Sequence, residues 1–275
     1  DYVVIAHTQT RGGHHVRAWL GDPDDDEPRK LRFLQCDEYA GYDALLVGEN
    51  TPSSAAATLK RVGCFAHARR KFHDLRDSHP VHANAALAHI QRLYAIEAEL
   101  TALRDEADPA VPLDYPAWHE TRRRVRQEHA VPLLDAYFDE CRKTLADLPL
   151  PRHPVAAAAR YSLNQEADLR RYVEHGVLEI DNNACERSIR PLCLGKKNWL
   201  FTGSPDASRA AAVIFSLVAS VTRHGKNPHA YLEHLLQSLR PLGPDPSDKA
   251  LDPLLPDRWT PRPRGNTADE QGVVG

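Results

Sequence analysis

The chain has 275 residues, 42% hydrophobic and 27% charged, which is typical of a globular protein with a large core. The formal net charge of −3, taken alone, argues mildly against a nucleic-acid partner, although basic residues gather in short clusters. No apolar run reaches the roughly 20 residues of a membrane span, and the first residues lack the basic-then-apolar pattern of a signal segment, so we expect neither feature. Five cysteines without a C-x-x-C pair indicate reduced thiols, so we expect a soluble, cytoplasmic protein.

The N-terminal region is expected to combine strands with a short helix. Residues 2–8 are rich in β-forming side chains, and a short helix is predicted over residues 14–20. A second strand over residues 31–36 ends directly before Asp37. Open α/β sheets place reactive groups at this end of a strand, so Asp37 is either a site carboxylate or an ordinary turn residue.

A third, short strand is predicted over residues 61–65, and several polar residues follow it. Cys64 and His67 have the spacing of half a zinc site, but no second half stands at zinc-finger distance. We therefore favour a buried Cys64 over zinc ligation, and we expect His67 to be hydrogen-bonded near the acidic residues of the candidate site. The next basic residues face either phosphates or solvent: Arg69, Arg70 and Lys71.

From about residue 82 to residue 176 the pattern is helical alone. Apolar residues recur at helical spacing over residues 93–103 and 133–145, and a third helix is predicted over residues 155–174. We interpret this region as a helical insertion between two parts of a sheet-containing core. The basic run 122–126 is expected to be a solvated helix face, with DNA contact as the alternative.

The most informative stretch begins at Asp181. Asp181, Asn182 and Asn183 can cap a helix that starts near Asn183. On that helix Glu186 and Arg190 lie one turn apart and share a face. Two interpretations stay open for Glu186: an acid that favours the first helical turn, or a metal ligand beside phosphate-binding side chains.

Basic and aromatic residues continue along the same stretch. Those expected to bind flanking phosphates, or in the case of the tryptophan to stack on a splayed base, are Arg187, Arg190, Lys196, Lys197 and Trp199. For Trp199 and Phe201 the alternative is burial in a strand. A helix buried on nearly all sides is expected over residues 207–224, and an amphipathic helix over 228–239.

Asp37 and Glu186 would act together only if the fold brings them close. Carboxylates with water and phosphate oxygens suit Mg²⁺, or Mn²⁺ in its place. Two such ions can activate a water or a 3′-hydroxyl and stabilise the leaving oxygen of a phosphodiester. The residues therefore predict metal-dependent chemistry on nucleic acid.

Three blocks of the chain, residues 35–42, 64–72 and 181–204, resemble the signature blocks of the insertion sequence 66 (IS66) family of transposases, in the same order. The resemblance covers roughly residues 2–240. It implies a DDE-type transposase with an RNase H-like α/β core, interrupted by a helical insertion before the final acid. This chain departs from the usual blocks at Glu38, where glycine is common, and at Phe65, where tryptophan is common.

The resemblance also assigns roles to residues. Asp37 corresponds to the second catalytic carboxylate and metal ligand, and Glu186 corresponds to the third. The residues expected to support the site are Cys64, His67, Asn182 and Asn183. The first catalytic Asp and the upstream DNA-recognition segments have no match, so we expect a core that is incomplete at the N-terminus and inactive alone.

The predicted organisation has four parts. Residues 1–78 form the first part of the RNase H-like core, 79–176 the helical insertion, and 177–240 the rest of the core with the Glu186 helix and C-terminal helices. Residues 241–275 are rich in proline and are expected to be a disordered or loosely attached tail.

The expected function is metal-dependent DNA strand cleavage and strand transfer in transposition of a bacterial mobile element. The expected partners are double-stranded DNA (transposon ends and target), further copies of the chain in a synaptic complex, and accessory proteins of the same element. Its location would be the cytoplasm, in association with the nucleoid. The alternatives are a catalytically incomplete remnant that binds only DNA or protein, and an RNase H-like nuclease acting in repair.

Overall fold

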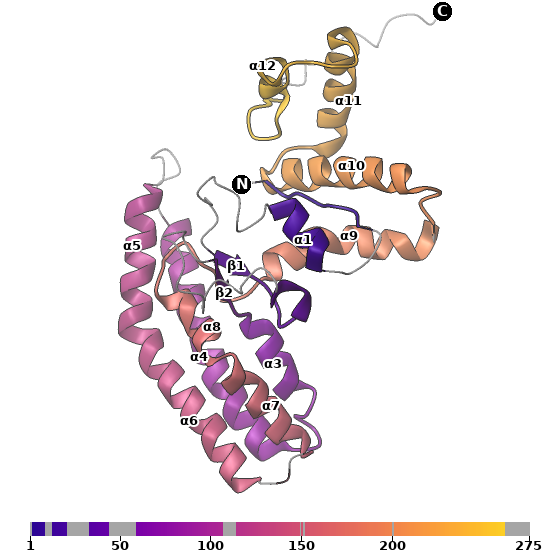
Figure 1. The fold of residues 1–275 in the computed structure, drawn as a ribbon. Coiled ribbons are helices and arrows are strands. Elements are labelled where there is room, and N and C mark those ends of the chain that lie inside the picture. The colour runs from indigo at the N-terminus through magenta and orange to yellow at the C-terminus, as the bar shows by residue number, and fades with distance from the viewer. Residues whose placement is uncertain are drawn as a thin grey trace, which may run out of the picture. The chain divides into compact units, whose positions relative to one another are not determined.

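The computed structural model describes residues 2–8, 13–20, 33–43, 59–106, 114–148, 150, 152–199 and 201–261. The chain divides into two compact units. We name them the bundle unit, which is Thr10–Ala184, and the split unit, which is Asp1–Gln9 together with Cys185–Gly275. The described residues are mostly helical, with a small parallel sheet (Figure 1).

The bundle unit packs a set of helices beside two short strands. Its elements are α1 (Gly13–Leu20), β1 (Phe33–Gln35), η1 (Ala40–Tyr42), β2 (Lys60–Val62), α3 (Phe65–His73), α4 (Pro80–Asp105), α5 (Tyr115–Val125), η3 (Arg126–Ala130), α6 (Val131–Asp147), α7 (Pro154–Asn164), α8 (Glu166–Arg170) and η4 (Arg171–Val173). Strands β1 and β2 pair in parallel, with Leu34 opposite Arg61. Helix α4 packs on α3 and α6, and α6 packs on α7 (Figure 1).

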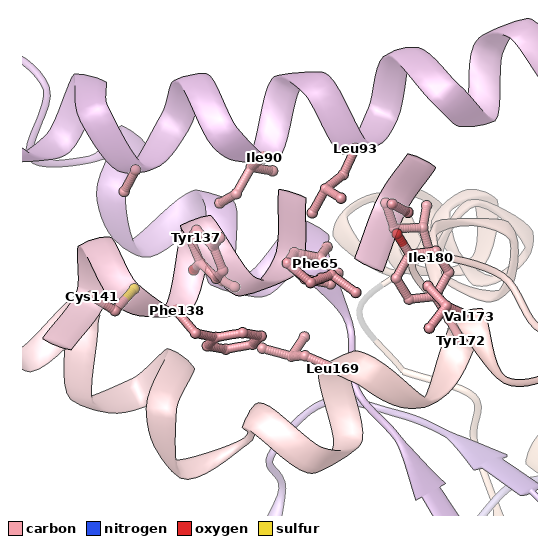
Figure 2. Packing of buried hydrophobic residues seen from close by; sticks show 14 of the residues in the cluster. Phe65, Ile90, Leu93, Tyr137, Phe138, Cys141, Leu169, Tyr172, Val173 and Ile180 are labelled. Atoms are coloured by element: carbon pink, nitrogen blue, oxygen red, sulfur yellow. The ribbon is translucent and has the colours of Figure 1, made fainter. Parts of the chain in front are cut away.

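The core of the bundle unit follows from apolar spacing along its helices. In α4 the buried residues are Ala83, Ala86, Ile90, Leu93, Ile96 and Leu100, which recur at intervals of three and four. Aromatic rings fill the centre (Figure 2). The centre of the Phe65 ring of α3 lies 5.8 Å from that of Tyr137 of α6 and 5.9 Å from that of Tyr172. The hydroxyl of Tyr137 is satisfied within this core by Ser162 Oγ at 2.7 Å.

The basic run 122–126 differs from the expectation. Arg122 and Arg126 lie one turn apart on the side of α5 and η3 that faces the core, and both are buried. Arg126 donates from Nε to Glu97 Oε1 at 2.8 Å and from Nη2 to Glu97 Oε2 at 2.7 Å. A solvated face and DNA contact are therefore both wrong for these two arginines, because paired charges can be buried.

Other elements of the bundle unit are shorter than expected. The strand predicted over residues 31–36 is Phe33–Gln35 within the described residues, and the strand over 61–65 is Lys60–Val62. Phe65 instead begins α3. The single helix predicted over residues 155–174 is interrupted at Gln165 and forms α7, α8 and η4.

The split unit is built from helices and one extended segment. Its elements are α9 (Asn183–Trp199), whose first two residues belong to the bundle unit, α10 (Pro205–Arg223), α11 (Pro228–Leu239), η5 (Arg240–Leu242), α12 (Asp248–Leu251) and η6 (Asp252–Leu254). Side chains cap two of these helices: Ser204 accepts from Ala207 N, and Asn227 accepts from Ala230 N. Gly203 and Gly225 adopt positive φ at the turns beside α10.

Residues 2–8 lie along α10 without pairing to another strand among the described residues. Ser220 Oγ accepts from Val3 N at 2.9 Å, and Ser216 Oγ accepts from Ile5 N at 2.8 Å. The two serines are one helical turn apart, which matches the two-residue repeat of an extended chain.

Helix α10 covers nearly the predicted residues but does not have the predicted burial. Its Val213 and Ile214 are 59% and 52% exposed, so the expectation of burial on nearly all sides is wrong for the unit as described. Serines and alanines make up much of the rest of its sequence, and these small residues contribute little apolar area to a core.

Residues 241–261 are ordered into η5, α12, η6 and a final turn, where a loosely attached tail was expected. Trp259 is 6% exposed, and its ring lies 5.3 Å from that of Tyr231 of α11. Lys226 Nζ donates to the carbonyls of Pro256, Asp257 and Trp259 at 2.6–2.8 Å. Residues 262–275 lie outside the described part of the chain.

Candidate functional site

Asp37 follows the end of β1, as the sequence predicts. The amide of Cys36 donates to Val62 O at 3.2 Å and continues the sheet by one residue, so Asp37 leaves the carboxyl edge of the β1–β2 pair. Its Oδ1 accepts from Tyr39 N at 3.2 Å, which is the geometry of an Asx turn. The side chain is partly exposed, and Glu38 beside it is exposed.

Cys64 lies at the neighbouring edge position, between β2 and α3. Its thiol is buried and donates to Asn182 Oδ1 at 3.0 Å. Burial raises the pKa of this thiol. Hydrogen bonds oppose the shift, and the bond with Asn182 has the largest opposing effect. Cys64 therefore links the end of β2 to the stretch that leads into α9. His67 lies in the first turn of α3 and is partly exposed.

Tyr161 of α7 lies near the same edge, and sequence reasoning missed it. Burial raises the pKa of its phenol, a hydrogen bond with Gln165 opposes the shift, and the nearby carboxylates of Glu38 and Asp37 raise the pKa further. The phenol therefore stays protonated and can act as a hydrogen-bond donor near the carboxylates of residues 37 and 38.

The basic residues of α3 form an exposed group beside this edge. Arg69, Arg70 and Lys71 are all exposed, as either of the two sequence interpretations requires. The ammonium of Lys71 lies 4.9 Å from the centre of the Tyr161 ring, which is a cation–π distance. We call these three residues the α3 basic group.

The start of α9 is where the sequence places it. The helix begins at Asn183, and Asp181 Oδ1 accepts from Asn183 N at 3.0 Å. Asp181 Oδ2 accepts from the hydroxyl of Tyr94 at 2.7 Å. Burial raises the pKa of Tyr94, and the hydrogen bond to Asp181 raises it further, so the phenol stays protonated and donates.

Helix α9 carries the remaining predicted residues in the split unit. Glu186 is partly exposed, and the exposed basic residues are Arg187, Arg190 and Lys197. Lys196 lies within the helix and Trp199 ends it, so the strand alternative for Trp199 is wrong. Phe201 is 84% exposed rather than buried in a strand. Asp37 belongs to the bundle unit, so its proximity to Glu186 stays a prediction.

The carboxylates and the Cys64–His67 pair are the side chains that could ligate a metal. Within the described ranges, no group of three or more His, Cys, Asp or Glu side chains is arranged to hold a metal ion. The Asp37 carboxylate has an oxygen type that Mg²⁺ prefers, and Mg²⁺ needs only one or two protein carboxylates beside water and phosphate.

The sequence pointed to Asp181 but not to Tyr94, which lies 87 positions earlier in the chain. A tyrosine among the apolar residues of a helix has the pattern of an ordinary core residue, and nothing local marks its hydroxyl. Gln35 gave no signal either; its Nε2 donates to Glu179 O at 2.6 Å and ties β1 to the segment before Asp181.

Comparisons with known proteins agree with the signature blocks. The chain is 30% identical to the uncharacterized protein y4qI of Sinorhizobium fredii over 224 residues, which are 80% of this chain and 38% of y4qI. The uncharacterized proteins y4jD and y4hP of the same organism are 27% and 28% identical over 230 and 273 residues. These matches cover 82% and 94% of this chain, and 41% and 43% of the relatives.

The chain thus spans about two fifths of the length of the curated relatives that it matches. No solved structure matches the chain. Within the part that the structure describes, every helix is too short or too polar to cross a membrane. The sequence model of the family described as "Transposase IS66 family" matches residues 1–210, which is well over half of the chain. The chain therefore belongs to the IS66 family of transposases.

Proposed function

We propose that this chain is part of the catalytic core of a DDE transposase, which cuts and joins DNA with Mg²⁺ or Mn²⁺. The observation that carries the proposal is the position of Asp37. It stands in the first of the three signature blocks and leaves the carboxyl edge of a parallel strand pair, where α/β proteins place reactive groups. The parallel pair and α3 would then be part of an RNase H-like core, with α4 to η4 as its helical insertion.

Asp37 and Glu186 would supply the type of oxygen ligand that a divalent ion prefers. Asp37 uses Oδ1 for one backbone amide, which is compatible with ligation through its second oxygen. Glu186 would supply another carboxylate from the first turn of α9. Bound metal would activate a water or 3′-hydroxyl for attack on a phosphodiester. The supporting residues Cys64, His67, Asn182 and Asn183 would hold the two acids in place.

DNA would be bound through phosphates. The α3 basic group lies beside the strand edge, and the arginines and lysines of α9 would add further phosphate contacts, with Trp199 stacking on a base. The transposon ends and the target would be the double-stranded partners, and several copies of the chain would assemble on them. Together these contacts would deliver a phosphodiester to the acidic centre.

Metal binding tests the catalytic part of the proposal. Paramagnetic titration with Mn²⁺ should give an affinity that falls at least about 10-fold in Asp37→Asn and in Glu186→Gln, since each change removes a charged ligand. Asp139→Asn is the matched control, because Asp139 is an exposed acid on α6. Equal affinities in the wild type and in both site variants would refute the metal centre.

DNA binding separates the enzyme from the remnant that only binds. Anisotropy of a labelled duplex over a salt series should give a shallower slope when the α3 basic group is replaced by glutamine, by about 0.9 for each phosphate that is no longer neutralised. A variant with Arg124→Gln and Lys143→Gln, both exposed on other helices, should keep the wild-type slope. If the chain binds the duplex, but Glu186→Gln does not change its Mn²⁺ binding, the result would favour the catalytically incomplete remnant.

A further inference from the structure

Residues 176–183 join the bundle helices to α9, and side chains or amides from several elements hold them along their length. We call this stretch the anchored segment. Four carbonyls of the segment accept hydrogen bonds: Gly176 O from Arg122 Nη1 at 2.9 Å, Leu178 O from Arg126 Nη1 at 2.8 Å, Glu179 O from Gln35 Nε2 at 2.6 Å, and Ile180 O from Phe65 N at 3.1 Å. Two of its side chains also accept: Asp181 Oδ2 from Tyr94 OH at 2.7 Å, and Asn182 Oδ1 from Cys64 Sγ at 3.0 Å.

Among these contacts, the one from Tyr94 acts on the beginning of a helix. Asp181 accepts from Asn183 N through Oδ1, and its Oδ2 accepts from both Asn183 Nδ2 and Tyr94 OH. The first amides of a helix have no partner within the helix, so the orientation of this carboxylate decides whether the amide of Asn183 is satisfied at the start of α9.

Tyr94 is itself held in place. It stands on α4 between residues of the buried stripe, and its neighbour Leu93 is fully buried (Figure 2). A tyrosine side chain has only two torsions, and the ring of Tyr94 is partly buried against the core. The hydroxyl therefore presents a fixed donor to Asp181, whereas water could not fix the carboxylate in one orientation.

We propose that Tyr94 is a positioning residue for Glu186. It acts through Asp181, which starts the helix in which Glu186 follows Asn183 by three residues. The inference rests on the proposed function, because it gives the helical insertion a task in the metal centre. It extends that function by naming a residue outside the signature blocks, on the longest helix of the described bundle.

The test is Tyr94→Phe in the full chain, with Tyr137→Phe as the matched control. Both changes delete one phenolic hydroxyl in the bundle unit, but the hydroxyl of Tyr137 bonds to Ser162 within the core and not to the anchored segment. In Tyr94→Phe the amides of residues 183–186 should exchange about 10-fold faster, since a bond to a charged group is removed. Mn²⁺ affinity should fall several-fold. Tyr137→Phe should leave both unchanged.

Each outcome decides one of the two proposals. If residues 183–186 exchange at the same rate in both variants, Tyr94 has no positioning role, whatever the metal result. Faster exchange with wild-type Mn²⁺ affinity also overturns the role, because the effect then ends at the helix. If the wild type binds no Mn²⁺ that depends on Glu186, the proposed function fails first, and the exchange data still decide whether Tyr94 starts the helix.

Discussion

Glu97→Gln is the most informative test of the buried charge network. Glu97 on α4 makes two charge-assisted bonds with Arg126, at 2.7 and 2.8 Å, and a longer contact of 3.4 Å with Arg122. The Arg126 side chain is 0% exposed. The glutamine keeps the size of the side chain and one acceptor oxygen, so the change removes charge with little change of volume.

The expected cost is large because Arg126 has no access to water. Removing one partner of a buried ion pair typically costs about 3–5 kcal/mol, since the other charge is left uncompensated. Arg126 keeps its bonds to the carbonyls of Tyr172 and Leu178, which places the estimate near the lower limit, about 3 kcal/mol. The exposed pair Glu120–Arg123 provides the control, and Glu120→Gln should cost less than about 1 kcal/mol.

The assay is urea unfolding followed by circular dichroism. Hydrogen exchange of the slowest amides of α4 then assigns the measured free energy of unfolding to the bundle unit. A double-mutant cycle uses Glu97→Leu, Arg126→Met and the variant that carries both changes. The double variant should be more stable than the sum of the single changes predicts, by at least about 2 kcal/mol, because no unpaired charge remains.

A decrease below about 1 kcal/mol in Glu97→Gln, equal to that of the exposed control, would refute this reasoning. It would mean that water reaches Arg126 or that another acid replaces Glu97. Strict additivity in the cycle would contradict the direct pairing as well.

Three further predictions follow from packing and from the thiols. Gly176→Ala should prevent stable folding of the bundle unit, measured by the disappearance of the cooperative urea transition, because a Cβ there overlaps a backbone carbonyl of α5. At pH 8 a thiol reagent should label the exposed Cys185 and Cys193 rapidly and the three buried cysteines only after urea is added; fast labelling of a third would contradict the burial. Burial raises the pKa of Cys36 and of Cys141 to about 12, so both stay protonated in the folded chain while they ionise near pH 9 when unfolded. Their contribution to the free energy of unfolding should therefore be complete below pH 9 and be lost between pH 9 and 12. In a variant with Cys36→Ala and Cys141→Ala, the free energy of unfolding should fall less steeply over this pH range than in the wild type.

Local sequence determined the elements whose causes are local. Helix α9 begins at Asn183 because Asp181 can cap it from two positions away, and α11 spans the predicted residues because Asn227 and its apolar spacing define it. Asp37 follows a strand because a β-rich run ends there. The signature blocks identified the family for the same reason, since each block is contiguous.

Burial and pairing depended on the tertiary structure. The sequence alone determined where α9 and α11 start, which residues carry charge, and which family the chain belongs to. Only the fold decided that Arg126 is buried against Glu97, that Tyr94 reaches Asp181, and that Trp259 packs on Tyr231. The physical reason is that each of these contacts joins residues far apart in the chain. The separation is 29 positions for Arg126 and Glu97, and 87 positions for Tyr94 and Asp181. No periodicity or cap within one element can specify a partner in another, because burial depends on which faces the whole chain brings together.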